Sequence, residues 1–298
     1  MISILIPFYN EEESLPLLYN QIVDTMVKLK REYEILYIDD GSTDKSVSKL
    51  KDCIQKDTHV HIIGNRKRLG KGEVLQKGIE KALGDIIIFM DADLQDDPSD
   101  IVYFLKKIDE GYDLINGVRK KRKDSFIVKL YSYFANAFLH TVMKSPFTDI
   151  NCGFKAIKKD VFKEIHLYAN NFRFLPLAAF YKGFKVGEVE VQNRDRIYGV
   201  SKYGWKKLYI GMMDTVTAYF IFQFAEKPLH FFGTVGLGFF GVGFIISLYL
   251  TIERIFFNVM LYRRPILQLG ILLIIIGIQI AMTGIIGELI VYLDKRKK

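Results

Sequence analysis

The chain reads Asp85-Ile86-Ile87-Ile88-Phe89-Met90-Asp91-Ala92-Asp93 within its first third. A short run of consecutive apolar residues predicts a strand that is buried on both faces, as in a parallel sheet covered by helices. Two acids follow the run at the carboxyl end of the predicted strand, where open parallel sheets bind their ligands. The stretch therefore predicts both a fold class and the position of a site.

Three further apolar runs precede this one, and helical stretches separate them. The runs cover residues 2–7, 34–38 and 59–63, and helices are predicted over 15–29 and 72–83. Strands that alternate with helices predict an α/β domain with a mostly parallel sheet flanked by helices.

Polar clusters follow the runs directly. Tyr9-Asn10-Glu11 follows the first run, Asp39-Asp40 the second, and the acids of 91–97 the fourth. Because parallel strands end at the same edge, we expect three strands to deliver acidic side chains to one place. Acids after strands also cap helices, and that interpretation stays open for Ser42 and Asp44.

Asp91 and Asp93 lie two positions apart, so an extended backbone directs both carboxylates to the same side. Two close carboxylates repel each other unless a cation joins them or one takes up a proton. Oxygen ligands suit hard divalent ions, so we expect Mg²⁺ or Mn²⁺ as the cofactor. Asp-x-Asp alone is common by chance; its place after a predicted strand, with Gln95 nearby, makes it specific.

The last quarter of the chain differs in composition from the rest. Residues 229–252 and 266–287 contain no Asp, Glu, Lys or Arg, and a helix of either length can cross roughly 30 Å of hydrocarbon. We expect two transmembrane helices that form a hairpin, joined over residues 253–265. Several glycines in the first span would allow close helix packing, which leaves a homo-oligomer open.

The charge pattern favours a multi-pass protein of the cytoplasmic membrane with its catalytic domain in the cytoplasm. Two spans place both ends on one side, and the basic tail 295–298 favours the cytoplasm, although Arg254, Arg263 and Arg264 make the signal mixed. The first run begins at Met1 without a leader segment, as expected of a domain that is not exported. The net charge of +8 suits anionic lipid, and no nucleic-acid motif accompanies it.

Five motifs follow one another in order between residues 2 and 205. They are Ile6-Pro7-Phe8-Tyr9-Asn10-Glu11-Glu12, Ile38-Asp39-Asp40-Gly41-Ser42-Thr43-Asp44, Asp91-Ala92-Asp93-Leu94-Gln95-Asp96-Asp97-Pro98, Asp149-Ile150-Asn151-Cys152-Gly153-Phe154-Lys155 and Arg196-Ile197-Tyr198-Gly199-Val200-Ser201-Lys202-Tyr203. Together they resemble the family-2 glycosyltransferases, specifically the dolichol-phosphate-mannose-synthase-like polyprenyl-phosphate glycosyltransferases. The predicted spans resemble the hairpin of the bacterial members. The resemblance implies a GT-A (Rossmann-like) fold, a nucleotide-sugar donor, a lipid-phosphate acceptor and inversion at the anomeric carbon.

The same resemblance implies roles for residues of this sequence. The residues expected to bind the donor nucleotide are Pro7, Tyr9, Glu11, Asp39, Asp40 and Lys71. The expected metal ligands, which would face the donor diphosphate, are Asp91, Asp93 and Gln95. The residues expected to meet phosphate are Arg119, Arg122, Arg196, Ser201 and Lys202. The expected catalytic set is Asp93, Asp149, Arg119 and Arg196. A solvated charge run is the alternative for Arg119 and Arg122.

The chain departs from the family around Cys152-Gly153, where the family often carries another acid and this sequence has Asp149 just upstream. Asp149 is expected either to orient the acceptor or accept a proton, or to have a structural role. A phosphate monoester has a second pKa of about 6, so the acceptor is already anionic and needs positioning above all. Arginine forks suit that task.

We expect three parts in the chain: a catalytic domain over 1–202, interfacial amphipathic helices over 203–227, and the hairpin with its basic tail over 228–298. Segments 126–143 and 203–224 combine aromatic, basic and apolar residues, a composition typical of helices at a membrane surface. Packing inside the globular domain is the alternative for both segments.

Other functions share parts of this pattern. A processive polysaccharide synthase usually has Gln-x-x-Arg-Trp and more spans, whereas the single Trp205 follows Gly204. A sugar nucleotidyltransferase needs a glycine-rich phosphate loop near the N-terminus, and residues 7–13 contain no glycine. A non-catalytic membrane scaffold would have no need of Asp91, Asp93 and Arg196. The expected reaction moves a sugar from UDP-glucose or UDP-N-acetylglucosamine to undecaprenyl phosphate, with GDP-mannose as the alternative donor.

Overall fold

The computed structural model describes residues 1–54, 57–119, 145–167, 171–194, 205–224, 227–257, 260 and 265–296. Contacts along the chain define two compact units, Met1–Thr215 and Val216–Lys298. The three-part division at residues 202 and 227 stays a prediction.

The first unit is built on a seven-stranded sheet in the order β3-β2-β1-β4-β6-β5-β7. The strands are β1 (Ile2–Phe8), β2 (Tyr33–Asp39), β3 (Val60–Gly64), β4 (Ile86–Phe89), β5 (Leu114–Arg119), β6 (Lys155–Lys158) and β7 (Val186–Val191). Among these strands β6 alone runs antiparallel, between β4 and β5. The prediction of a mostly parallel sheet is confirmed, and the four runs predicted from the sequence are β1 to β4.

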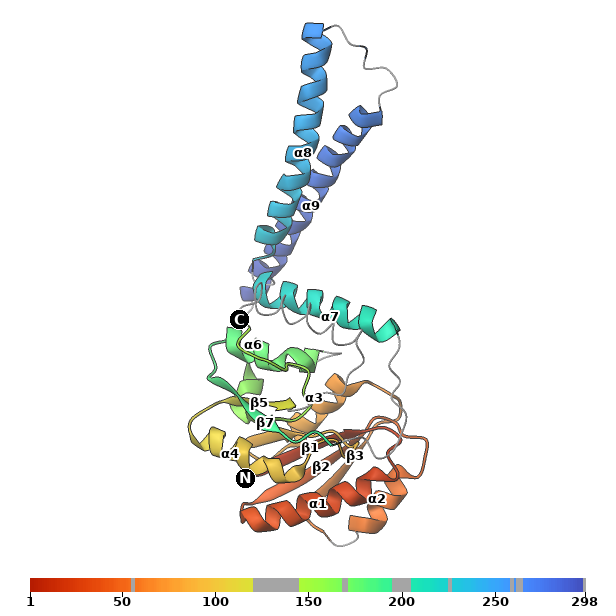
Figure 1. Cartoon of the computed structure of the whole chain (residues 1–298), viewed down its shortest axis with the longest axis vertical. Helices are drawn as coiled ribbons and strands as arrows, with labels where there is room; N and C mark the ends of the chain where they lie inside the picture. Colours follow the sequence, from red (N-terminus) through yellow and green to blue (C-terminus); the bar gives the residue numbers. More distant parts are fainter. Residues whose placement is uncertain are drawn as a thin grey trace. The chain divides into compact units, whose positions relative to one another are not determined.

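Continuous apolar runs form these strands because both faces of the sheet are covered. On one face, Ile4 and Ile6 belong to a core shared with helix residues such as Leu18 and Phe104. On the other face Gly78 lies against the side chains of Leu5 and Ile38. The helices of this unit are α1 (Ser14–Leu29), α2 (Ser46–Ile54), α3 (Lys71–Lys81), α4 (Ile101–Asp109) and α6 (Leu175–Tyr181), with short 3-10 turns η1 (Pro98–Asp100), η2 (Lys159–Lys163) and η3 (Asn171–Phe174). Figure 1 shows α1 and α2 on the opposite side of the sheet from α3 and α6.

Helix α1 illustrates how local sequence sets an element. Its fully buried apolar residues Leu15, Leu18 and Ile22 recur at helical spacing. Each such burial stabilises the fold by about 1.5–3 kcal/mol. The helix ends where Lys30 adopts a left-handed conformation with φ 52° and donates its backbone N–H to the carbonyl of Met26.

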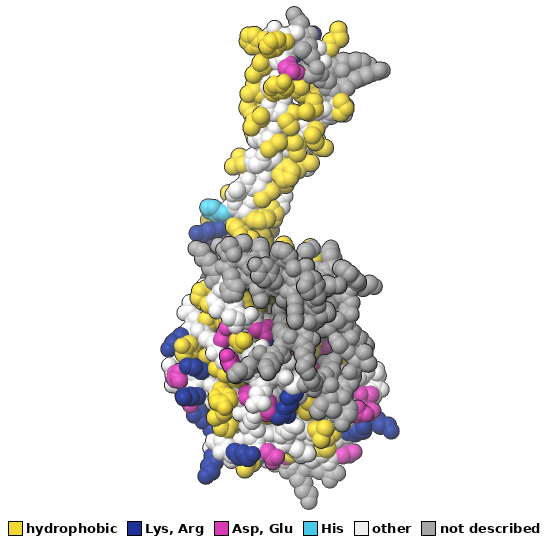
Figure 2. Space-filling model, viewed as in Figure 1, with side chains coloured by type: hydrophobic (Ala, Val, Ile, Leu, Met, Phe, Trp, Pro, Cys, Tyr) yellow, Lys and Arg dark blue, Asp and Glu magenta, His cyan; other side chains and the backbone are white. Residues whose placement is uncertain are grey.

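The second unit contains the apolar helices α8 (Pro228–Phe257) and α9 (Pro265–Lys295), and α7 (Trp205–Phe224) leads into it. Both candidate spans contain 30 residues, with mean hydropathies of 2.1 and 2.5, so each is long and apolar enough to cross a membrane. Figure 2 shows hydrophobic side chains covering this hairpin. Residues 253–257, predicted as part of the connection, continue α8 because they contain no glycine or proline that would end it.

Glycines line the contact between α8 and α9. A Cβ added to Gly236 would lie 2.6 Å from the carbonyl oxygen of Gly277, and one added to Gly243 would lie 2.5 Å from that of Gly270. The two backbones therefore touch directly, which is how membrane helices gain packing contacts in lipid. Gly236 and Gly243, which were among the glycines predicted to allow close packing, therefore make their close contacts within the hairpin itself.

Candidate active site at the carboxyl edge of the sheet

Strands β2, β1 and β4 are neighbours and run parallel, so their carboxyl ends lie side by side. Phe8 pairs with Asp39 at the end of β1 and β2, and Leu5 pairs with Phe89 at the end of β4. The segments that follow these strands carry Tyr9, Asp40 and Asp91. The parallel register thus brings the predicted acidic clusters to one edge.

Asp91 pairs with a lysine from the start of the neighbouring helix. The Lys71 ammonium, at the first position of α3, donates to Oδ1 of Asp91. Burial opposes ionisation of Asp91, but the positive charge of Lys71 outweighs it and holds the pKa of Asp91 below its usual value. Lys71, predicted to bind the donor, is therefore placed at the predicted metal site.

The acidic loop after β4 has an unusual backbone. Leu94 has a φ of 62° although it is not glycine, a conformation that costs about 1–3 kcal/mol and often occurs at functional sites. Its side chain is buried, which anchors the loop. The turn lets Oδ1 of Asp93 accept the backbone N–H of Gln95 at 3.3 Å. Asp93 and Gln95 are thus held together beyond the strand end.

Asp96 is a buried acid for which the sequence predicts no role. Its Oδ2 accepts the backbone N–H of Asp91 at 3.3 Å. Burial first, and then the negative charge of Asp91, raise the pKa of Asp96 to about 7. Asp97 lies next in the chain; it binds the Ser99 backbone N–H at 3.0 Å and forms an ion pair with Arg194.

The donor set at this edge fits a hard divalent cation. In the described part of the chain, no group of three or more His, Cys, Asp or Glu residues could hold a metal. Mg²⁺, however, is usually bound by one or two carboxylates together with substrate phosphates. Asp91 and Asp93 are the two carboxylates predicted for that role, and a nucleoside diphosphate would supply the remaining oxygens.

The carboxylates of Asp39 and Asp40 accept hydrogen bonds from the backbone of the loops around them. Asp40 Oδ1 accepts the backbone N–H of Leu69 at 2.6 Å and that of Gly70 at 3.2 Å. Asp39 accepts the N–H of Ser42 at 2.8 Å. Both predicted nucleotide-binding acids therefore already hold loop backbone at the sheet edge.

A cation and an aromatic ring lie beside these acids. The Arg68 guanidinium stands 4.3 Å from the centre of the Tyr9 ring and 3.7 Å from Asp40. Glu11 accepts the hydroxyl of Ser14 at 2.7 Å, and Pro7 lies within β1. Arg68 was not among the predicted residues, although it lies just before the Gly70-Lys71 pair.

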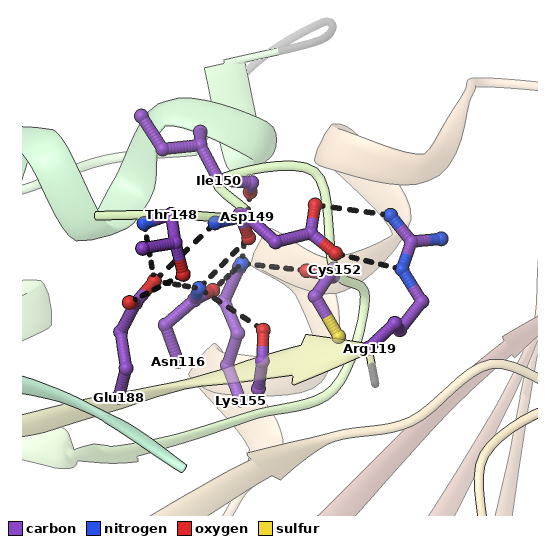
Figure 3. Close-up of polar contacts among 9 residues, drawn as sticks. Asn116, Arg119, Thr148, Asp149, Ile150, Cys152, Lys155 and Glu188 are labelled. Atoms are coloured by element: carbon purple, nitrogen blue, oxygen red, sulfur yellow. Dashed lines mark hydrogen bonds and ion pairs between the residues drawn. The ribbon is translucent and has the colours of Figure 1, made fainter. Parts of the chain in front are cut away.

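Arg119 and Asp149 form a two-bond ion pair (Figure 3). Nε of Arg119 lies 2.8 Å from Oδ2 of Asp149, and Nη2 lies 3.1 Å from Oδ1. Burial disfavours the charged guanidinium, but hydrogen bonding to Asp149 outweighs it and raises the pKa of Arg119. The structure thus joins two residues that the sequence proposed separately.

Not all of the predicted residues lie within the described part of the chain. Those outside the described residues are Arg122, Arg196, Ser201 and Lys202, together with segment 126–143. The polar residues near the site that the sequence analysis did not single out are Arg68, Asp96, Asn116, Lys155, Glu188 and Arg194. Asp96 and Lys155 lie within two of the five sequence motifs. Their position in a motif is the sequence signal that could have identified them.

The chain belongs to glycosyl transferase family 2, whose model matches residues 3–182. It is a glycosyltransferase of that family. It is 31% identical over 294 residues to dodecaprenyl-phosphate galacturonate synthase of Rhizobium johnstonii, covering 97% of this chain and 87% of the relative. It is also 31% identical to undecaprenyl-phosphate 4-deoxy-4-formamido-L-arabinose transferase of Proteus mirabilis, covering 100% of this chain and 91% of the relative. These relatives are polyprenyl-phosphate sugar transferases.

Solved structures confirm the GT-A fold. Glucosyl-3-phosphoglycerate synthase from Mycobacterium tuberculosis matches with a TM-score of 0.59 and 17% identity, over 74% of this chain and 80% of that one. A complex of the same enzyme with Mn²⁺, UDP and phosphoglyceric acid matches with a TM-score of 0.58 and 16% identity, over 74% and 78%. Mannosyl-3-phosphoglycerate synthase from Rubrobacter xylanophilus matches with a TM-score of 0.59 and 16% identity, over 74% and 72%.

Proposed function

We propose that this glycosyltransferase moves a sugar from a nucleoside diphosphate donor to the phosphate of a polyprenyl lipid. One observation carries the proposal: the chain combines the Lys71–Asp91–Asp93 edge of the sheet with a two-helix apolar hairpin. The first feature suits a charged diphosphate, and the second suits an acceptor that resides in lipid. The full-length similarity to polyprenyl-phosphate sugar transferases supports the same assignment.

On the donor side, the protein's task is to hold the diphosphate and stabilise its departure. Asp91, Asp93 and Gln95 would hold Mg²⁺ or Mn²⁺, which supplies Lewis-acid neutralisation of the diphosphate charge when bound. Lys71 provides a second positive charge at the same edge. When a diphosphate enters, Lys71 can exchange its bond to Asp91 for one to a phosphate oxygen, because an ammonium has three donors.

On the nucleoside side, Tyr9 and Arg68 offer a stacked aromatic ring and guanidinium. Pro7, Glu11 and Asp39 line the ends of the neighbouring strands, and Asp40 fixes the turn that leads into α3. We assign this part of the edge to the nucleoside. The part of the sheet edge beyond β4 and near β5 then remains for the sugar and the acceptor.

On the acceptor side, Arg119 is the best-placed cation of the described residues. Its guanidinium is held in a fixed plane by Asp149, and a guanidinium of fixed orientation suits phosphate recognition. A carboxylate that accepts two guanidinium N–H bonds is better suited to orienting the arginine than to accepting a proton. We therefore assign Asp149 to positioning, with Arg122, Arg196, Ser201 and Lys202 as the further proposed phosphate contacts.

The proposed chemistry needs no strong base. The acceptor phosphate attacks the anomeric carbon from the face opposite the leaving diphosphate, so the new bond has the inverted configuration. The monoester is mostly dianionic near neutral pH, since its second pKa is about 6. Alignment of the two reacting groups can then supply most of the rate enhancement.

We place the enzyme in the cytoplasmic membrane as a multi-pass protein, with its catalytic domain in the cytoplasm, where nucleotide sugars are made. The basic C-terminal tail supports that orientation, and the two uncharged spans support the multi-pass topology. Segment 203–227 is proposed to lie at the membrane surface and to guide the lipid phosphate to the site.

The test is transfer of labelled sugar to undecaprenyl phosphate by the purified full-length protein. The donor arms are UDP-glucose, UDP-N-acetylglucosamine and GDP-mannose. Two further arms use nucleotide donors of galacturonate and 4-deoxy-4-formamido-L-arabinose, the sugars in the relatives' names. Each donor is run with Mn²⁺ and with EDTA.

We expect a labelled lipid from a UDP-linked donor, lost with EDTA and restored by added Mn²⁺ or Mg²⁺. Product that persists in EDTA would overturn the metal assignment. Label in a water-soluble acceptor but not in lipid would overturn the acceptor assignment. Product only from GDP-mannose would replace the UDP proposal with the mannosyl alternative.

A further inference from the structure

Three strands place polar side chains beneath the segment 148–153, which follows the undescribed residues 120–144 and leads into β6. Asn116 comes from β5, Lys155 from β6 and Glu188 from β7, which are neighbours in the sheet. Figure 3 shows all three directed toward the segment. Asn116 and Lys155 are fully buried, with exposures of 0% and 1%.

The Lys155 ammonium has three N–H donors, and three acceptors surround it. Its ammonium donates to Oδ1 of Asn116, to the carbonyl of Cys152 at 2.6 Å and to the carbonyl of Ile150 at 3.3 Å. An ammonium is the side-chain group that carries three N–H donors on one atom, so it can satisfy three converging acceptors. None of these three acceptors is charged, although burying an ammonium is costly without an ion pair. Stability alone does not explain a lysine here.

The other two side chains hold the beginning of the same segment. Nδ2 of Asn116 donates to the carbonyl of Asp149 at 2.9 Å. Glu188 accepts the backbone N–H of Thr148 at 2.9 Å and its hydroxyl at 2.8 Å. The segment is therefore held from below at Thr148, Asp149, Ile150 and Cys152.

The fixed segment touches the site at two points. Asp149 binds Arg119 through both carboxylate oxygens. Gly153 lies so close to Asp91 that an added Cβ would stand 2.6 Å from its Oδ2. A shift of the segment would therefore move the arginine assigned to the acceptor phosphate and the aspartate assigned to the metal.

We propose that Lys155, with Asn116 and Glu188, is a positioning residue that fixes the segment 148–153 in the conformation needed for acceptor binding. The three side chains are called the cradle below. Its role in acceptor binding rests on the proposed function, whereas its hold on the segment does not. The first part of the test therefore uses a readout independent of transfer.

Cys152 is that readout. The chain contains two cysteines; Cys53 is exposed and Cys152 is buried. Burial raises the pKa of the Cys152 thiol to about 12, so the native protein should label slowly with a maleimide once Cys53 is replaced by serine. Any variant that releases the segment should expose Cys152 and speed its labelling.

In the Cys53→Ser background, we expect Lys155→Met and Asn116→Ala each to raise the Cys152 labelling rate about tenfold or more, because buried acceptors lose their donors and local opening becomes easier. Lys158→Met is the matched control: it removes a lysine of the same strand whose partner is Asp113 at 3.0 Å. Its Cys152 should stay protected. Unchanged protection in both Lys155→Met and Asn116→Ala would overturn the proposal.

Glu188 gives a second pair of variants that does not depend on how Lys155→Met folds. Glu188→Gln keeps an oxygen acceptor for the Thr148 N–H and should protect Cys152 as the parent does. Glu188→Ala removes both acceptors and should expose it. Equal labelling of these two variants would contradict a role for Glu188 in the cradle.

Steady-state kinetics then distinguish a displaced acceptor-binding residue from a general loss of active protein. For Asn116→Ala we expect the KM for polyprenyl phosphate to rise about tenfold and the donor KM to change much less. Asn116 holds Asp149, the partner of Arg119, whereas Lys155 still holds Cys152, next to Gly153 and Asp91. A fall in kcat with both KM values unchanged would indicate inactive protein and would overturn the positioning role. A parent protein that transfers no sugar would overturn the proposed function, yet would leave the labelling comparison valid.

Discussion

Gly153 lies directly against Asp91: a Cβ added to Gly153 would stand 2.6 Å from Oδ2 and 3.0 Å from Cγ of that carboxylate. This is shorter than any ordinary carbon–oxygen contact. The motifs that contain Asp91 and Gly153 lie more than fifty residues apart in the sequence, yet they are in contact at the predicted metal site. This contact is possible because Gly153 has no side chain.

Gly153→Ala should therefore displace Asp91 and slow transfer. A misplacement of about 1 Å near the reacting groups can cost about 100-fold in rate. We expect a loss of that order, with an increased requirement for Mn²⁺ in titrations of activity. Gly64→Ala, at a position where nothing lies within 4 Å of an added Cβ, is the control for the effect of adding a methyl group elsewhere in the sheet. A Gly153→Ala enzyme with parental rate and metal dependence would contradict the placement of the metal at Asp91.

Asp93→Ala should abolish transfer and leave the fold intact, because it removes a proposed metal ligand from a loop. Metal charge stabilisation is worth several kcal/mol, so the loss should reach about a thousandfold. The control is Asp160→Ala, whose side chain is 78% exposed and pairs only with Lys163 nearby. Thermal unfolding of both variants should match the parent. Retained activity in Asp93→Ala would show that the metal is held elsewhere.

Arg194 and Arg196 should respond differently to alanine substitution. Arg194 pairs with Asp97 and donates to Gln21 at 3.1 Å, so Arg194→Ala should mainly lower stability, by about 1–3 kcal/mol. Arg196, proposed to meet phosphate, should mainly lower kcat/KM. Unfolding and kinetic measurements on both variants check this. Parental kinetics in Arg196→Ala would remove it from the phosphate-binding set.

Lys155 should set an alkaline limit on activity. Burial lowers the pKa of Lys155 to about 8 from its ordinary 10.5. Above pH 8 the folded protein holds a neutral amine with two donors for three acceptors, so transfer measured with Mg²⁺ should fall. Activity that stays level to pH 10 would contradict the need for a charged Lys155.

The stability linked to Lys155 should change in the opposite direction. Between pH 8 and 10.5 an unfolded chain keeps the lysine proton that the folded chain has lost. Because the unfolded state then binds more protons, the contribution of this group to the free energy of unfolding rises with pH. The parent should gain stability relative to Lys155→Met across that window. Chemical denaturation at several pH values measures the difference.

In the hairpin, Gly277→Leu should force α8 and α9 apart. A Cβ at Gly277 would lie 2.6 Å from both the carbonyl oxygen of Gly236 and the backbone nitrogen of Phe240. Overpacking of this kind costs about 1–3 kcal/mol, and the melting temperature in detergent should fall. Gly238→Leu is the matched control, because nothing lies within 4 Å of a Cβ there. Equal melting temperatures would contradict the close contact.

The parallel half of the sheet could be predicted from sequence because its strands are continuous apolar runs. Residues 2–7 and 85–90 carry that signal locally, and the structure places strands there. β6 carries no such signal: Lys155-Ala156-Ile157-Lys158 is short and has a lysine at each end. Its insertion between β4 and β5 depends on contacts between distant segments, which local patterns do not record.

The residues of the candidate site likewise divide into those that a local sequence pattern predicts and those that only the fold brings together. Asp91 and Asp93 could be found because strand ends and acids coincide in the sequence. The partner of Asp91 could not, since Lys71 reaches it only through the packing of α3 on β1 and β2. Asn116 and Glu188 are single polar residues within strands, and only the sheet order shows that both serve one segment.

The reversed strand has a consequence for how the protein is made. Since β6 separates β4 from β5, a nascent chain that ends before residue 155 has no partner for the facing edges of those two strands. Unpaired edges readily join other chains. The catalytic unit can close only after β6 has left the ribosome, so synthesis that stalls between residues 119 and 155 should yield a product prone to aggregation.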